Sequence, residues 1–203
     1  WMMFTTAYGA LVDIADVQAG QTVLIRAASS SVGLAAIQIT KSRGAVPVAL
    51  TRRSNKRDEL LQHGAAHVIA TEEQDLVAEV ARITDGKGAN VAFDPVGGSE
   101  VAKILEALGY LGIFFQYGAL DTTPLAVPVM PLLGKDLTVR GYQLFEITKD
   151  PARLEKAKAY IVKGLASGAL KPVLARTFKL DDIVEAHRFM ESNEQVGKIV
   201  VMV

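Results

Sequence analysis

The stretch Thr22-Val-Leu-Ile-Arg-Ala-Ala-Ser-Ser-Ser-Val-Gly33, followed by Leu34-Ala-Ala-Ile-Gln38, decides the fold. It joins an apolar run, a turn of small residues and an alanine-rich run, which predicts a buried strand, a tight turn and a helix. A helix N-terminus carries partial positive charge, and small side chains let a phosphate approach its backbone N–H groups. The stretch therefore predicts a phosphate-binding turn whose contacts are Ser29, Ser30, Ser31, Val32 and Gly33.

The turn departs from the G-x-G-x-x-G pattern of dinucleotide-binding folds. Ala28 and Ser30 occupy the first two glycine positions, and only Gly33 remains. On this turn alone, a serine-capped helix of some other α/β protein stays open as an alternative.

Short apolar runs alternate with longer runs of helical period on both sides of the turn. This alternation predicts an α/β fold of the Rossmann type, a doubly wound parallel sheet of six strands covered on both faces. The expected strands are 22–27, 46–50, 67–70, 90–94, 111–117 and 137–141. The expected helices are 32–43, 55–63, 74–84 and 99–108, with C-terminal caps at Gly44, Gly64, Gly86 and Gly109.

Further elements flank this repeat. Residues 4–17 predict a lead-in helix, and residues 151–167 predict a long amphipathic helix. A strand–helix–strand tail is expected at 173–178, 182–190 and 198–203, with Asp181 or Asp182 as the helix N-cap. We expect two parts, a cofactor-binding domain over 1–150 and a C-terminal part over 151–203.

Composition excludes several classes of protein. The chain of 203 residues is 50% hydrophobic and has 22 basic and 22 acidic side chains, which argues against disorder and against nucleic-acid or membrane-surface binding. No apolar run is long enough to cross a membrane. The chain has no cysteine, which fits a reducing compartment such as the cytoplasm. Its three histidines, His63, His67 and His187, lack the spacing of metal ligands, so we predict no metal site.

The end of the second predicted strand indicates which nicotinamide cofactor the fold prefers. NAD-binding folds usually place an acid there, whereas this chain continues as Thr51-Arg-Arg-Ser-Asn-Lys-Arg57. Arg and Lys make strong charge-assisted hydrogen bonds to phosphate. The cluster predicts NADP(H), and the alternative interpretation is a solvated helix start.

Five motifs together resemble the medium-chain dehydrogenase/reductase superfamily, in particular its quinone-oxidoreductase-like and zinc-type alcohol-dehydrogenase-like members. They are Thr5–Leu11, the turn Ala27–Gly33, Asp94–Gly98, Tyr117–Ala119 and Gly197–Val201. The resemblance implies an NADPH-dependent oxidoreductase that transfers hydride to a carbonyl, quinone or enone. The Tyr160/Lys163 spacing of three, rather than four, argues against a short-chain reductase.

The resemblance also implies roles for individual residues. Arg52, with Ser54 or Lys56, would contact the 2′-phosphate, next to Thr51. The remaining cofactor contacts would be Val96 and Gly97 near the adenosine or ribose, Tyr117 and Gly118 near the nicotinamide ribose, and Phe145 near the nicotinamide. Thr6 would reach the nicotinamide edge or lie on the helix surface. We expect Asp94 to cap a turn rather than act as a general acid, and we predict no catalytic residue in this chain.

Family members begin with a GroES-like barrel, and a start at Trp1 leads us to expect a cofactor-binding half without it. The strands 173–178 and 198–203 would then lack most of their partners, and the piece alone would bind cofactor but turn over poorly. We expect a homodimer through strand 137–141. Two alternatives remain, an enoyl-reductase domain of a polyketide or fatty-acid synthase and a non-catalytic NADPH-binding module.

Overall fold

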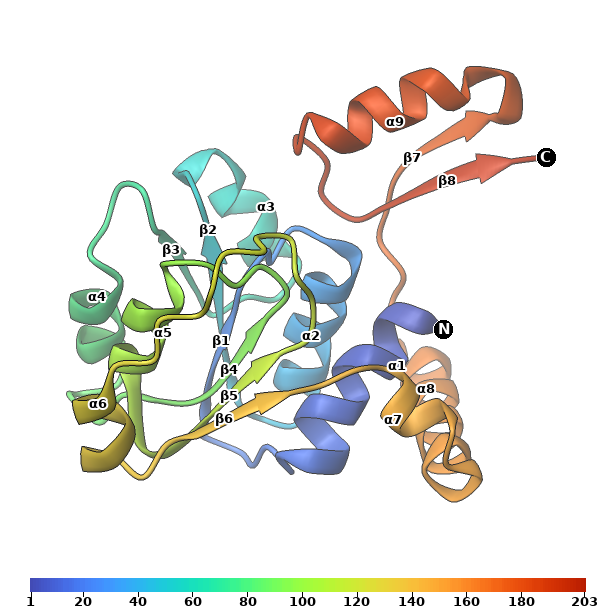
Figure 1. Cartoon of the computed structure of the whole chain (residues 1–203). Coiled ribbons are helices and arrows are strands. Elements are labelled where there is room, and N and C mark those ends of the chain that lie inside the picture. The colour runs from blue at the N-terminus through green and yellow to red at the C-terminus, as the bar shows by residue number, and fades with distance from the viewer.

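The central sheet has six parallel strands in the order β3-β2-β1-β4-β5-β6 (Figure 1). The computed structural model describes all of residues 1–203. The strands are β1 (Thr22–Ile25), β2 (Val46–Thr51), β3 (His67–Ala70), β4 (Ala89–Asp94), β5 (Leu108–Gln116) and β6 (Thr138–Gly141). The order reverses between β1 and β4, as in doubly wound Rossmann folds, and the predicted fold class is confirmed.

Helices cover both faces of this sheet because its strands are apolar on both sides. One core contains Val23, Ile25 and Phe93 and packs under the lead-in helix, α2, α3 and α8. The other contains Leu24, Val48 and Phe114 and packs under α4 and α5. The helices are α1 (Met2–Tyr8), α2 (Ser31–Ser42), α3 (Arg57–Gln62), α4 (Leu76–Ile83), α5 (Val101–Ala107), α6 (Val129–Gly134), α7 (Phe145–Thr148), α8 (Pro151–Ser167) and α9 (Ile183–Glu191). No helix is both long and apolar enough to span a membrane.

Three sequence predictions need correction. Gly109 is no helix cap but lies inside β5, where an added Cβ would come within 2.2 Å of Lys87 O. Strand β6 is not covered on both faces, because it is an edge strand and Val139 is exposed. The lead-in helix is α-helical only to Tyr8 and continues as the π-helix Gly9–Ile14 (η1), with Ala15 N donating to Ala10 O.

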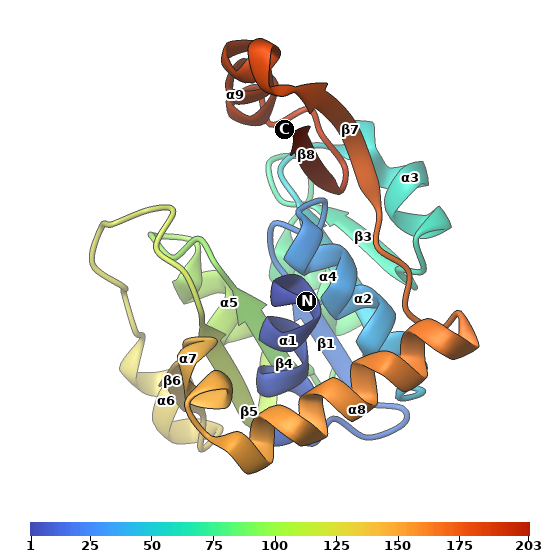
Figure 2. The ribbon, with the colours of Figure 1, turned by 90° about the vertical axis from the view of Figure 1, so that its right-hand side faces the viewer.

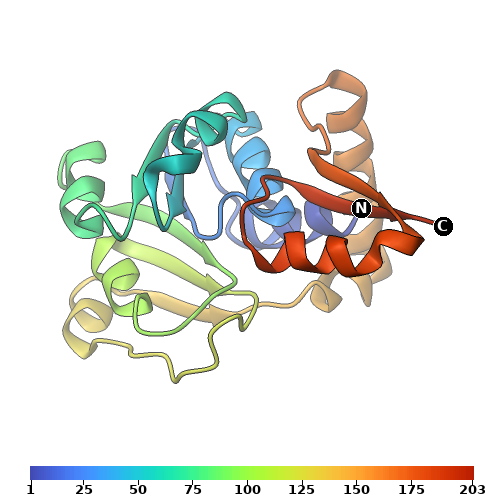
Figure 3. The same cartoon turned by 90° about the horizontal axis from the view of Figure 1, so that it is seen from above.

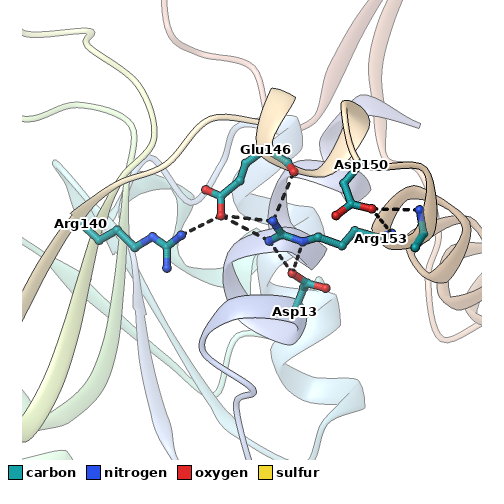
Figure 4. A network of polar contacts seen from close by, with 6 residues as sticks. Asp13, Arg140, Glu146, Asp150 and Arg153 are labelled. Atoms are coloured by element: carbon teal, nitrogen blue, oxygen red, sulfur yellow. Dashed lines mark hydrogen bonds and ion pairs between the residues drawn. The ribbon is translucent and has the colours of Figure 1, made fainter.

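An ion-pair network fastens the lead-in helix to the elements after β6 (Figure 4). Arg153 of α8 donates to Asp13 Oδ2 through Nε at 2.8 Å and to Glu146 Oε1 through Nη1 at 3.3 Å. Arg140 of β6 donates to the same Glu146 oxygen at 2.7 Å. Asp150 caps α8 by accepting from the backbone of Ala152 and Arg153. The network therefore joins η1, β6, α7 and α8, which meet side by side in Figure 2.

The C-terminal unit, residues 173–203, stands apart from the large sheet. Its strands β7 (Leu174–Lys179) and β8 (Lys198–Met202) pair in parallel with each other, and α9 crosses between them. The unit rises above the loops at the carboxyl edge of the sheet (Figures 1 and 3). Asp182 is at the N-cap position of α9, but its side chain makes no capping hydrogen bond.

Candidate functional site

The turn after β1 presents free backbone donors at the start of α2. Ser30 caps the helix, with its Oγ accepting from Gly33 N at 3.0 Å. The N–H groups of Ser29 and Val32 have no acceptor within the protein. Ala27 takes a left-handed φ of 50°, a strained conformation of the kind that clusters at functional turns. This arrangement can receive an anion, as helix N-termini in α/β folds do.

Gly33 is required at this turn by close packing. A Cβ there would lie 2.6 Å from both Ala27 O and Ala28 O, which are backbone atoms that cannot move cheaply. The single glycine that remains of the fingerprint is therefore the one that lets the helix pack against the strand. The turn, defined here as residues 27–33 and called the phosphate turn below, has no glycine at its other positions, even at Ala27 with its left-handed φ.

The loop after β4 is braced against the end of β1 by a buried ion pair. Arg26 Nη1 lies 2.9 Å from Asp94 Oδ2 and donates to Gly97 O at 2.6 Å. Asp94 is fully buried, and its other oxygen accepts from Val96 N at 2.6 Å. Asp94 thus orders the loop that carries Val96 and Gly97, as predicted for a turn-capping residue. Sequence reasoning missed Arg26.

The end of β5 completes the same edge of the sheet. The ring of Tyr117 stacks on Phe93 with centroids 3.8 Å apart, and its hydroxyl is buried without a hydrogen-bond partner. Burial and the nearby Asp94 carboxylate raise the pKa of this hydroxyl, which stays protonated. At Gly118, an added Cβ would come within 2.7 Å of Pro95 O. The β4 and β5 loops are therefore packed too closely for a larger residue at Gly118.

The cations after β2 divide into two groups. Arg53 pairs with Glu72 at 2.9 Å. The Ser54 side chain first, and then Ser54 N, which donates to Glu73 Oε1 at 3.1 Å, lower the pKa of Glu73. In contrast, the side chain of Arg52 is exposed and makes no hydrogen bond or ion pair, although its backbone O accepts from Glu72 N at 3.0 Å. Ser54 therefore faces the acidic loop after β3.

Lys56 lies beside the phosphate turn. Its Nζ donates to Ser29 Oγ at 3.1 Å and has no carboxylate within ion-pair distance. Burial first, and then the neighbouring Arg52, lowers the pKa of this ammonium group below its usual value. Two cations without acidic partners thus lie next to a turn with free N–H donors, an arrangement suited to an anionic ligand.

The two residues predicted near a nicotinamide differ in their surroundings. Phe145 begins α7 after β6 with 58% of its surface exposed, so it is not a core residue. Thr6 is buried, and its hydroxyl donates to Met2 O at 2.8 Å within its own helix. It is therefore not plain helix surface, and its hydroxyl already has an acceptor. Thr51 is half-buried at the end of β2.

A parallel sheet that reverses its order beside a capped phosphate turn defines a Rossmann domain of the kind that holds dinucleotides at its switch point. The family model described as "Zinc-binding dehydrogenase" matches residues 31–160. The chain belongs to this family, within the medium-chain dehydrogenase/reductase superfamily, as its motifs predicted.

Several known proteins are similar over nearly the whole chain. The quinone oxidoreductase of Escherichia coli, solved with NADPH, has 27% identity and a TM-score of 0.90 and covers 100% of this chain. The JamJ enoyl reductase has 28% identity and a TM-score of 0.84 over 98%. The highly reducing polyketide synthase ltbA of Aspergillus luteorubrus is 29% identical over 206 residues, 98% of this chain. This chain spans 63%, 60% and 6% of those proteins, respectively.

The family description raises the question of zinc, and the residues of this chain do not fit it. No group of three or more His, Cys, Asp or Glu side chains lies close enough together to hold a metal ion. The chain has no cysteine, and its histidines lie in different elements, at the end of α3, in β3 and in α9. The residues of this chain therefore offer no set of ligands for zinc.

Proposed function

We propose that this chain is the cofactor-binding half of an NADPH-dependent oxidoreductase of the medium-chain type. The observation that carries the proposal is the pairing of Arg52 and Lys56, two cations without acidic partners, beside the phosphate turn. A 2′-phosphate carries nearly two negative charges and needs such partners. The NADPH complex of the similar E. coli enzyme supports the same assignment.

In this proposal each loop at the carboxyl ends of the sheet strands holds one part of the cofactor. The phosphate turn, Ser29 to Gly33, holds the pyrophosphate, and Arg52 with Lys56 holds the 2′-phosphate beside Thr51. The loops with Val96, Gly97, Tyr117 and Gly118 line the ribose and nicotinamide, and Phe145 covers the nicotinamide. Ser54, bonded to Glu73, is the weakest of the expected contacts. NADPH supplies the hydride, and the protein orients it toward a carbonyl, quinone or enone.

The whole enzyme would include partners beyond this chain. We propose that a catalytic barrel of the same protein packs against the carboxyl edge and β7–β8, since the similar proteins are longer than this chain. We also propose a homodimer through β6, an edge strand with exposed Val139 that is free to pair with a second copy. We expect the enzyme in the cytoplasm.

A second candidate is the enoyl-reductase domain of a polyketide synthase. The similarity to the JamJ enoyl reductase and to the fungal synthase favours it. The coding sequence on either side of this chain separates the two, because a synthase continues into carrier or ketoreductase domains. A non-catalytic NADPH-binding module is the third possibility, and it predicts no turnover even with a catalytic barrel attached.

Calorimetric titration of the chain with NADPH and NADH tests the central proposal. We expect NADPH to bind at least tenfold more tightly, because each charge-assisted hydrogen bond to the 2′-phosphate is worth about 1.5–3 kcal/mol. Equal affinities would remove the 2′-phosphate site from the proposal. Failure of both nucleotides to bind would overturn the proposed function.

A further inference from the structure

Lys56 joins three segments that are far apart in the sequence. Its Nζ donates to Ser29 Oγ of the phosphate turn at 3.1 Å, to Asn193 O at 2.5 Å and to Gln195 O at 3.1 Å. An ammonium group has three hydrogens to donate, and all three are used. The two carbonyl groups belong to the loop between α9 and β8, so the C-terminal unit holds this ammonium group in place.

The C-terminal unit meets the body of the protein at the same point through its backbone. Gly197 N donates to Ser29 O at 2.9 Å, and Gly197 forms a parallel bridge with Ser30. Every hydrogen bond that joins residues 174–203 to residues 1–167 involves Lys56 or the phosphate turn. Beside these bonds, Val196 packs into the main core. The polar contacts that dock this unit therefore all lie at the anion site.

Gly197 fits this contact for a steric reason. Its φ is 106°, which favours glycine, and an added Cβ would come within 2.6 Å of Val173 O. The loop 193–197 can therefore lie flat against both the start of the unit and the phosphate turn. This close approach makes the loop a wall beside Ser29 and Lys56.

Docking and anion binding depend on the same ammonium group. Neither Lys56 nor Arg52 has a carboxylate within ion-pair distance, and the more distant Glu59 and Glu194 offset their mutual repulsion only in part, so an anion beside them would be stabilising. Because the three ammonium hydrogens are already donated, a phosphate beside the two cations would act on Lys56 through its charge and would stabilise the ammonium group where the carbonyl groups of Asn193 and Gln195 hold it. In turn, a docked C-terminal unit keeps the cation in place for the phosphate. Linkage between two such sites is reciprocal.

We propose that loop 193–197 is a wall of the 2′-phosphate site and that Lys56 is the positioning residue that couples docking of the C-terminal unit to binding of the phosphorylated cofactor. The inference rests on the proposed function and deepens it. It gives the C-terminal unit a part in cofactor discrimination through backbone carbonyl groups and one lysine, although the unit contributes no charged side chain of its own to these contacts.

Hydrogen exchange with two small probes tests the proposal on the chain as it exists. The first probe, 2′,5′-ADP, carries the extra phosphate of NADPH, and the second, 5′-AMP, lacks it. We expect saturating 2′,5′-ADP to slow exchange in residues 193–198 by at least about fivefold, the lower range of typical coupling. Saturating 5′-AMP should slow exchange there much less. In Lys56→Met, 2′,5′-ADP should have no greater effect than 5′-AMP.

Controls separate positioning from folding. Lys87→Met removes an exposed lysine in the turn before β4, far along the chain from this contact, and should behave as the wild type. Lys56→Gln keeps hydrogen-bond donors without the charge; it should stay folded by circular dichroism and still lose the response to 2′,5′-ADP.

Each outcome decides between the two proposals. Binding of 2′,5′-ADP with no slowing in residues 193–198 would overturn the coupling and leave the proposed function standing. A wild-type response in both Lys56 variants would overturn the role of Lys56. Failure of 2′,5′-ADP to bind the wild type would overturn the NADPH assignment itself and the coupling with it.

Discussion

Arg26 and Asp94 link the two strands at which the sheet reverses its order. The guanidinium Nη1 lies 2.9 Å from the buried carboxylate and also holds Gly97 O at 2.6 Å. One side chain thereby fixes the distance between the loops after β1 and β4, the loops between which we propose that the dinucleotide lies. The site depends on this ion pair for its shape.

Asp94→Asn should destabilise the protein by about 2–3 kcal/mol. Removing one partner of a fully buried pair typically costs about 3–5 kcal/mol, and we expect a value at or below the bottom of that range because the Arg26 side chain is 19% exposed. Urea unfolding followed by circular dichroism measures the change. Glu100→Gln, which breaks the exposed Lys103–Glu100 pair, is the control and should cost less than about 1 kcal/mol. A similar small cost for Asp94→Asn would contradict this account of the switch point.

Ser30→Ala should lower the free energy of unfolding by about 1 kcal/mol, because Gly33 N loses its acceptor at the start of α2. Ser30→Gly should cost only a few tenths of a kcal/mol, since glycine is also a favourable N-cap. Thermal unfolding of the two variants side by side measures the difference. Equal losses would show that the serine cap has no special part in holding the phosphate turn.

Gly33→Ala should be among the most damaging single changes in the chain. The new Cβ would overlap backbone oxygens at 2.6 Å, and overpacking of this kind costs about 3 kcal/mol or more when the neighbours cannot move. Gly134→Ala is the matched control, because nothing lies within 4 Å of its added Cβ. The yield of soluble protein and the midpoint of urea unfolding measure the effect of each of the two variants. A Gly33→Ala variant as stable as Gly134→Ala would show that the turn relaxes freely.

Tyr117→Phe should leave the protein equally stable or raise its stability by up to about 1 kcal/mol, because the buried hydroxyl has no partner to lose. Tyr160→Phe should instead lower the free energy of unfolding, since the Tyr160 hydroxyl lies 3.0 Å from Ser42 Oγ and this hydrogen bond would be lost. Denaturant unfolding measures both. A clear loss of stability in Tyr117→Phe would mean that the hydroxyl has a partner in solution.

Most of the fold could be predicted from the sequence because its signals are local. The run Thr22–Ile25 and the helix from Ser31 are adjacent, so periodicity and turn composition are enough to place them. The short helices α6 and α7 escaped prediction because six and four residues are too few for a period to show. Gly109 was misassigned because its glycine requirement comes from Lys87, a residue of another loop.

The site was only partly predictable, and the missing part is long-range. The cationic cluster after β2 is visible in the sequence. Which of its residues contact acidic side chains is not. Glu72 and Glu73, which engage Arg53 and Ser54, come from the next loop. The contact of Lys56 with Asn193 and Gln195 spans more than 130 positions and uses backbone carbonyl groups, which leave no side-chain signal. Gly197 was the one visible sign of that contact.

The affinities of Arg52→Ala for NADPH and NADH test the central claim most directly. We predict that NADPH binds at least about tenfold more weakly, since one charge-assisted hydrogen bond is lost, while NADH changes by less than about threefold. Arg53→Ala, which removes the neighbouring arginine that Glu72 already engages, should alter neither affinity selectively. An equal loss for both nucleotides in Arg52→Ala, or no loss for either, would contradict the assignment of the 2′-phosphate site.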